Sequence, residues 1–179
     1  MIVEGPSTFW IGLDDTDERE YGCTTRDFDS LLSHLTTSGF HIDDPRLVRL
    51  WPFAPTRTRG NAALSASLTT ECIQNLETTL DEWFHNRFNE HESGLEIHSA
   101  QPVLLLTKQP LPESMYWDTV RGFVELTHRI TELSHYHHRL WSTESGMGGL
   151  IGASAAIAWQ GHHDYTWECT AWRHRSGPR

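Results

Sequence analysis

Hydrophobic residues recur along the chain at spacings that predict alternating strands and helices. Residues 8–13 (TFWIGL) are aromatic and β-branched and are followed by acidic turn residues, which predicts a buried strand. Between residues 26 and 38 the apolar side chains lie three or four positions apart, which predicts a helix that Gly39 is placed to end in the left-handed conformation. Residues 47–53 and 62–68 are predicted as the next two strands.

The second half of the chain is predicted to be richer in helix. Apolar residues recur at helical spacing over residues 73–88 and 115–133, with Thr70 the candidate N-cap of the first of these two long helices. A short apolar strand, residues 103–106, lies between them. Three further elements are predicted at the end: a Gly-rich turn (146–149), a small-residue helix (150–158) and a strand (165–172).

This alternation predicts an α/β or α+β fold, with a mixed β-sheet and flanking helices in two small packed lobes. The first predicted lobe covers residues 1–69 and carries an acidic loop. Residues 70–140 are predicted to form a helix-rich second lobe, for which a ferredoxin-like fold is one option, and residues 141–179 are predicted to pack back on the first. A chain of 179 residues is long enough to bury a core without disulfide staples.

The net charge, the cysteines and the lengths of the apolar runs argue against several classes of protein. The formal net charge of −10 argues against a broad electrostatic nucleic-acid binder, so phosphate recognition is expected to be focal. Three scattered cysteines (Cys23, Cys72 and Cys169) form neither a disulfide framework nor a zinc ribbon and fit a reducing compartment. No apolar run approaches the roughly 20 residues that span a bilayer, and no signal peptide opens the chain. We therefore expect a soluble, cytoplasmic protein.

The strongest chemical signal is the loop that follows the first predicted strand. Asp14, Asp15 and Asp17 place three carboxylates within four positions, and a divalent cation between them would relieve their repulsion. Mg²⁺ prefers oxygen ligands and is often held by one or two carboxylates together with substrate phosphates. The plain alternative is a solvated acidic turn.

The residues after this loop add a candidate anion site. Gly22-Cys23-Thr24-Thr25 opens the first predicted helix with backbone N–H groups and two hydroxyls, and a helix N-terminus favours phosphate. The alternative is that Thr24 or Thr25 only caps the helix.

Two further loops could contact phosphate. Arg57 and Arg59 can form a forked clamp, and Gly60-Asn61 follow at a point where the backbone can approach a ligand closely. Gly146, Gly148 and Gly149 precede the small-residue helix and could cradle a phosphate. The Lys-Ser/Thr of a P-loop is absent, and a tight turn is the alternative there.

The histidines give no zinc-enzyme signature, because no pair has the helical spacing with an intervening Glu. We expect these side chains to be exposed or locally hydrogen-bonded: His135, His137, His138, His162 and His163. A Ser/His/Asp triad has no GxSxG-type signature here.

Several motifs in order resemble the archaeal tRNA(Ile) agmatinylcytidine synthetases. The motifs are IGLDDTD (11–17), GCTT (22–25), RLVRL (46–50), TRGNA (58–62), LIGA (150–153), AAI (155–157) and DYT (164–166). They extend over nearly the whole chain, and ordered motifs are more specific than any one of them.

The resemblance implies an ATP-dependent kinase-like module that phosphorylates a tRNA cytidine, with a ferredoxin-like region following or interleaved. Asp14, Asp15 and Asp17 would be the metal-binding and catalytic acids, and Thr24 falls at the family's autophosphorylated threonine. By the same resemblance, the nucleotide site would be lined by Arg59, Gly60 and Asn61. The candidate phosphate contacts described above add Thr25, Arg57, Gly148 and Gly149 to this site.

This chain also departs from the family pattern. The OB-fold domain and zinc ribbon that grip tRNA have no counterpart in these residues, an Arg of the family's Gly-rich stretch is replaced by Gly148, and its Asn-Pro appears as Gln101-Pro102. We therefore expect an ATP- and Mg²⁺-dependent phosphotransferase or ATP-hydrolysing protein that acts on tRNA, if at all, through a separate RNA-binding chain. The alternative is a non-catalytic nucleotide-binding or partner-subunit module. The acceptor and the oligomeric state are left open.

Overall fold

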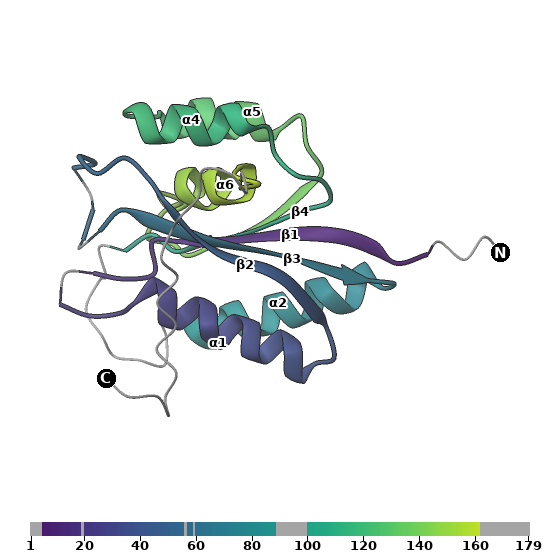
Figure 1. Cartoon of the computed structure of the whole chain (residues 1–179). Helices are drawn as coiled ribbons and strands as arrows, with labels where there is room; N and C mark the ends of the chain where they lie inside the picture. Colours follow the sequence, from purple (N-terminus) through teal and green to yellow (C-terminus); the bar gives the residue numbers. More distant parts are fainter. Residues whose placement is uncertain (1–4, 19, 56, 59, 89–99, 162–179) are drawn as a thin grey trace, which may run out of the picture.

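The computed structural model describes residues 5–18, 20–55, 57–58, 60–88 and 100–161 of the chain. The elements follow in the order β1 (Ser7–Asp14), α1 (Thr24–Thr37), β2 (His41–Arg49), β3 (Ala62–Thr70), α2 (Ile73–Phe88), β4 (Val103–Thr107), α4 (Glu113–Arg121), α5 (Leu126–Leu133), β5 (His138–Ser142) and α6 (Leu150–Ala158). Figure 1 shows a sheet with α1 and α2 on one face, and α6 on the other with α4 and α5 above it.

The five strands form one sheet in the order β2-β3-β1-β4-β5. This confirms the predicted class of a sheet with flanking helices. The sheet is antiparallel at every pairing, however, and not mixed. The physical reason is that β3 lies between β1 and β2, so the two strands joined by the α1 crossover are not neighbours.

The ferredoxin-like topology lies in the first six elements. Their order, β1-α1-β2-β3-α2-β4, together with the strand order β2-β3-β1-β4, is that of a split βαβ unit. Its strands come from both sides of residue 69, so the two predicted lobes share one sheet. As a domain boundary, that division stays a prediction.

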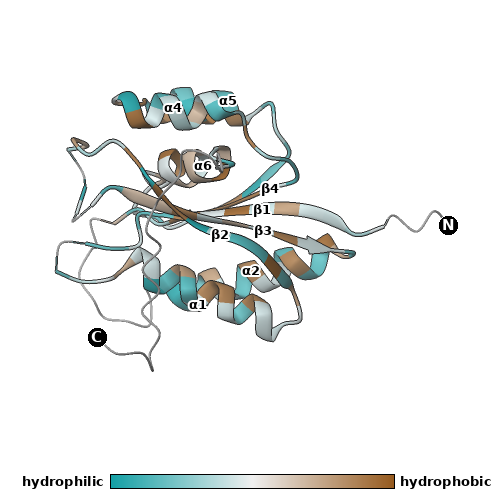
Figure 2. Ribbon diagram, in the orientation of Figure 1, coloured by the Kyte–Doolittle hydropathy of each residue, from teal (hydrophilic) through white to brown (hydrophobic). Residues whose placement is uncertain are grey.

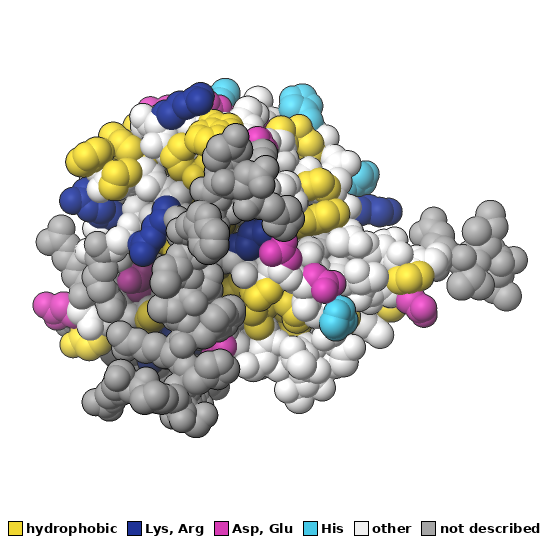
Figure 3. Space-filling model, in the orientation of Figure 1, with side chains coloured by type: hydrophobic (Ala, Val, Ile, Leu, Met, Phe, Trp, Pro, Cys, Tyr) yellow, Lys and Arg dark blue, Asp and Glu magenta, His cyan; other side chains and the backbone are white. Residues whose placement is uncertain are grey.

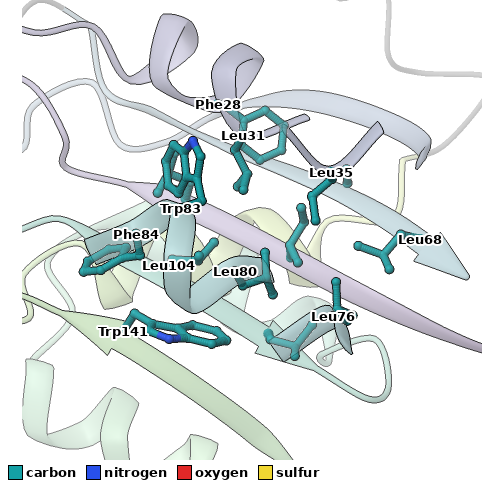
Figure 4. Close-up of a cluster of buried hydrophobic side chains, with 14 of the residues drawn as sticks. Phe28, Leu31, Leu35, Leu68, Leu76, Leu80, Trp83, Phe84, Leu104 and Trp141 are labelled. Carbon is teal, nitrogen blue, oxygen red and sulfur yellow. The ribbon is translucent and has the colours of Figure 1, made fainter. Parts of the chain in front are cut away.

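The larger core lies between the sheet and the helices α1 and α2. Phe9, Ile11 and Leu13 project to this face of β1 because alternate residues of a strand share a face. Figure 4 shows α1, α2 and the strands contributing to one cluster that includes Phe28, Leu31, Leu35, Leu68, Leu76, Leu80, Trp83, Phe84, Leu104 and Trp141. Each of the two helices thus buries one stripe of apolar side chains against the sheet, which explains the helical spacing of these residues in the sequence.

The opposite face of the sheet is covered by α6, whose small residues let it approach the strands closely. All but one of its residues are buried, and Figure 2 shows its largely apolar ribbon between the sheet and α4. Gly12 faces α6, and a β-carbon there would overlap the carbonyl oxygen of Ala153. This close contact places the N-terminus of α6 beside the end of β1.

Several predicted boundaries changed. Residues 115–133 do not form one helix, because the backbone at Gly122 is extended (φ 173°) and separates α4 from α5. The second strand begins earlier and ends earlier than predicted. Thr70 ends β3, and its hydroxyl accepts the Cys72 N–H before α2 begins, so it is not the helix N-cap. Strand β5 was not predicted. The strand predicted at 165–172 lies outside the described residues.

None of the helices in the described part of the chain is both long and apolar enough to cross a lipid bilayer.

Candidate functional site

The acidic loop leaves the sheet at the end of β1 and is fixed by a buried carboxylate that forms an ion pair with a more exposed arginine. Thr16 Oγ1 donates to Asp27 Oδ2 (2.8 Å), and Arg87 donates to Asp27 Oδ1 from Nε (3.0 Å) and Nη2 (2.9 Å). Asp27 is 2% exposed, so the guanidinium supplies the compensating charge that a buried carboxylate needs. Asp27 on α1 and Arg87 on α2 thus hold the loop in place.

Asp15 occupies the tightest point of the loop. Its φ of +57° lies in the left-handed region, which Asn and Asp tolerate better than other side chains with a β-carbon. Its Oδ2 accepts the backbone N–H of Gln101 at 3.1 Å. Such backbone conformations cost about 1–3 kcal/mol and cluster at functional sites, so this turn is a candidate for function.

Asp14 and Asp15 are acids whose ionised forms the folded chain disfavours. Burial, and then the charge of Asp15, raise the pKa of Asp14 well above its ordinary value. Burial also raises the pKa of Asp15, with smaller contributions from Asp17 and Glu18, while the Gln101 N–H opposes the rise. Asp14 Oδ2 lies so close to α6 that a β-carbon at Gly152 would overlap it.

Asp17 joins the acidic loop to two other predicted motifs. Its Oδ1 accepts the hydroxyl of Thr24 at 2.9 Å, and its Oδ2 accepts the hydroxyl of Thr58 at 3.0 Å. Thr24 is the first residue of α1 and is buried, whereas Thr25 beside it is exposed. The structure therefore brings Thr24 to the acids but turns Thr25 to solvent.

The Gly-rich turn also reaches the acidic loop, through a residue that the sequence analysis did not place in the site. Gln101 Oε1 accepts the N–H of Gly148 at 2.8 Å, and its backbone oxygen accepts the N–H of Gly149 at 3.1 Å. A β-carbon at Gly148 would be 3.4 Å from Asp15 Oδ2. Both N–H groups predicted to cradle phosphate are thus bonded to Gln101 in this arrangement.

Two of the residues predicted on the loop after β2 form hydrogen bonds with the backbone of the same segment. Arg57 is exposed, and its Nη1 donates to the carbonyl of Ala54 at 3.3 Å. Asn61 Nδ2 donates to the carbonyl of Trp51 at 2.8 Å, which stabilises the turn. Gly60 is exposed, and Arg59 lies outside the described residues. From this loop, Thr58 is the described side chain that bonds an acid of the site.

A hollow of about 670 Å³ lies elsewhere, at the start of β1 and the end of β3. Hydroxyl and amide side chains predominate in its lining, which includes Thr69, Thr70, Asn75 and Thr79. None of the predicted site residues lines it, so we place the candidate site at the acidic loop, where the perturbed acids lie.

Asp14, Asp15 and Asp17 do not form a metal-binding group by themselves. Among the residues that the structure describes, no three His, Cys, Asp or Glu side chains form a group that could hold a metal ion by themselves. Asp17 accepts hydroxyl groups with both carboxylate oxygens, and no Lys or Arg among the described residues forms an ion pair with Asp14 or Asp15. His135, His137 and His138 form no metal group; His162, His163 and Cys169 are outside the described part.

The raised pKa values predict how stability depends on pH. The ordinary aspartate pKa is 3.8, so above this pH the unfolded chain releases protons that the folded chain retains. The stability contributed by protonated Asp14 is complete below pH 3.8 and is lost as the pH rises through its folded pKa.

We therefore expect an Asp14→Asn variant to gain in Tm over the metal-free wild type as pH rises from about 4 to about 7.5. The gain should be about 3–5 °C for each unit by which the Asp14 pKa is raised. Thermal unfolding by circular dichroism in EDTA measures it. A Tm difference that does not change with pH would contradict the raised pKa.

Comparison with known proteins places this geometry in context. The family model for the "TiaS TCKD domain" matches residues 10–144. The chain is 30% identical over 170 residues to the tRNA(Ile2) 2-agmatinylcytidine synthetase TiaS of Caldivirga maquilingensis, covering 91% of this chain and 38% of that protein. It is 32% identical over 173 residues to the enzyme of Methanosarcina acetivorans, covering 89% and 37%. The chain thus spans less than two fifths of the length of these relatives.

Solved structures share the fold. The TiaS–tRNA(Ile2)–ATP complex matches with a TM-score of 0.73 at 24% identity, over 85% of this chain and 36% of that one. The TiaS–tRNA(Ile2)–AMPCPP–agmatine complex matches with a TM-score of 0.68 at 22% identity, over 84% and 36%.

Proposed function

The chain belongs to the TiaS TCKD domain family, and from this premise we propose that it binds ATP with Mg²⁺ at the acidic loop and transfers or hydrolyses a phosphoryl group. TiaS relatives are named as tRNA-modifying synthetases, and one related structure is a complex with tRNA(Ile2) and ATP. We extend this use of ATP, in the service of tRNA modification, to the present chain.

The observation that carries the proposal is a contrast between the buried Asp27 and the half-buried Asp14 and Asp15. Asp27 is compensated by Arg87, whereas burial and neighbouring acids raise the pKa values of Asp14 and Asp15, and no Lys or Arg among the described residues forms an ion pair with either. A folded chain keeps uncompensated acids at a cost in stability. That cost in stability is explained if a cation, bound together with a polyphosphate, neutralises the two carboxylates.

Asp14 and Asp15 fit Mg²⁺, because this ion is commonly held by one or two carboxylates together with phosphate oxygens and water. When bound, Mg²⁺ would offset the negative charge that accumulates on the phosphates during transfer. The chain's own residues would orient the groups that react. Thr24 is oriented by its hydrogen bond to Asp17, which lies at a distance suited to accept the hydroxyl proton.

We propose that any tRNA is presented by a separate RNA-binding chain. On the face in Figure 3, acidic and basic side chains of the described residues are interspersed, which fits focal rather than broad contact with phosphates. Co-purification from the native cell with an RNA-binding protein tests this extension.

A second candidate is a module that binds nucleotide without turning it over. It is favoured by the contacts of Gly148 and Gly149, whose N–H groups donate to Gln101 and are not presented to a phosphate. Fewer donors at the phosphates would mean less stabilisation of the transition state.

One experiment separates the two candidates. The purified chain is titrated with Mg-ATP while Tm and phosphate release are followed, with and without tRNA. We expect nucleotide at 100 times its Kd to stabilise the fold by about 2.7 kcal/mol and ATP to be consumed. Stabilisation without consumption supports the binding module. If Tm does not move and no ATP is consumed, both candidates are excluded.

A further inference from the structure

Gln101 is the residue around which the acidic loop and the Gly-rich turn are assembled. It lies just before β4, and because β4 is antiparallel to β1, Val103 pairs with Asp14 and Gln101 comes to lie beside Asp15. Its backbone N–H donates to Asp15, its backbone oxygen accepts from Gly149, and its side chain accepts from Gly148. One residue therefore connects both parts of the site.

The side chain of Gln101 adds what its backbone cannot. Almost any residue could make the two backbone contacts, but the 2.8 Å bond to the Gly148 N–H needs an acceptor at the end of a side chain of this length. The carboxamide also fills the space around the turn. A β-carbon would be 2.6 Å from Gln101 Oε1 at Gly146 and 2.8 Å at Gly148, so glycine at both positions is matched to Gln101.

We propose that Gln101 is a positioning residue for nucleotide binding, an inference that rests on the proposed function. Its carboxamide holds the Gly-rich turn against Asp15. The turn is therefore already ordered beside any phosphates that bind at Asp14 and Asp15.

Without the carboxamide, Gly148 loses its hydrogen bond. The backbone bond from Gly149 and the bond from Ser145 to the Ala100 carbonyl remain. Part of the ordering of the turn then falls to the nucleotide. Binding then becomes weaker, because ordering a loop on association reduces affinity.

The test is a Gln101→Ala variant, with Gln74→Ala on the exposed surface of α2 as the matched control. We expect KM for Mg-ATP to rise at least tenfold in the Gln101 variant while kcat stays within threefold, and the control to behave as wild type. If the chain binds without turnover, Kd for Mg-ATP by calorimetry replaces KM. A merely structural role would reduce the folded fraction, and so kcat, without changing KM.

A double-mutant cycle tests the match between Gln101 and Gly148. Gly148→Ala alone is expected to weaken binding at least tenfold, whereas in the Gln101→Ala background it should add less than twofold, because the group that it would collide with is gone. Full additivity of the two changes, or an unchanged KM in the Gln101→Ala variant, would overturn the inference. If the wild type binds no nucleotide, the proposed function fails, and this inference fails with it.

Discussion

Replacing Asp15 by Asn is expected to lower Mg-ATP turnover by roughly 100-fold or more, the scale of losing one preorganised electrostatic group at a reacting phosphate. Asn tolerates the left-handed backbone at this position (φ +57°) and keeps an oxygen that can accept the Gln101 N–H. The substitution therefore removes charge from the site and leaves the local geometry in place. Steady-state phosphate release at saturating Mg-ATP measures the effect.

The Asp15→Asn substitution should not lower the stability of the fold, although it lowers turnover. Because burial and neighbouring acids disfavour ionised Asp15, the Asp15→Asn variant without metal should be at least as stable as the wild type at neutral pH. The matched control is Asp29→Asn, an exposed position on α1. An Asp15→Asn protein that keeps turnover within threefold of wild type would contradict the assignment of Asp15.

Replacing Arg129 by Met is expected to lower the free energy of unfolding by about 2–4 kcal/mol, because the buried oxygens that Arg129 bonds lose a donor at about 1–3 kcal/mol each. Arg129 is fully buried (0% exposed), and burial lowers the pKa of its guanidinium while Glu132 opposes that shift. Nη1 donates to Ser154 Oγ (2.6 Å) and Nη2 to the Met115 carbonyl (3.0 Å). The side chain thus joins α5 to both α4 and α6.

The loss from Arg129→Met should appear in urea unfolding as a lower midpoint with an unchanged slope. Arg121→Met is the control, because Arg121 is an exposed residue that contacts the ring of Trp117. Because α6 borders the site at Gly152, the Arg129 variant should also bind nucleotide more weakly. A change in unfolding free energy below about 1 kcal/mol would show that the packing of α6 does not depend on this network.

The local pattern of the sequence was sufficient wherever an element buries one clear face. The first strand, the helix at α1 and the small-residue helix at α6 were all predicted near their observed bounds. Strand β5 was missed because only Trp141 of its residues is fully buried and its neighbours are exposed or half-buried, so no alternation is visible. The break at Gly122 was missed because the apolar spacing continues on both sides of it.

Pairing between distant strands was beyond the reach of local patterns. The position of β3 between β1 and β2 makes the sheet antiparallel, and no spacing within a strand specifies its neighbour. The same limit applies to the site. Asp14, Asp15 and Asp17 are close in sequence and were found as a group, whereas Gln101 lies 86 positions from Asp15. Gln101 could be recognised by its position two residues before the strand that pairs with β1, but this needs knowledge of how β4 is aligned with β1.

The central claim is that Asp14 and Asp15, at the end of β1, hold a cation and a nucleotide phosphate. A crystal grown with Mn²⁺ and a non-hydrolysable ATP analogue, with data collected at the manganese absorption edge, tests it most directly. We predict an anomalous peak within coordination distance of the Asp14 and Asp15 carboxylates, bridged to the phosphates. Nucleotide bound instead in the hollow lined by Thr69 and Thr79, with no cation at Asp14 and Asp15, would contradict the claim.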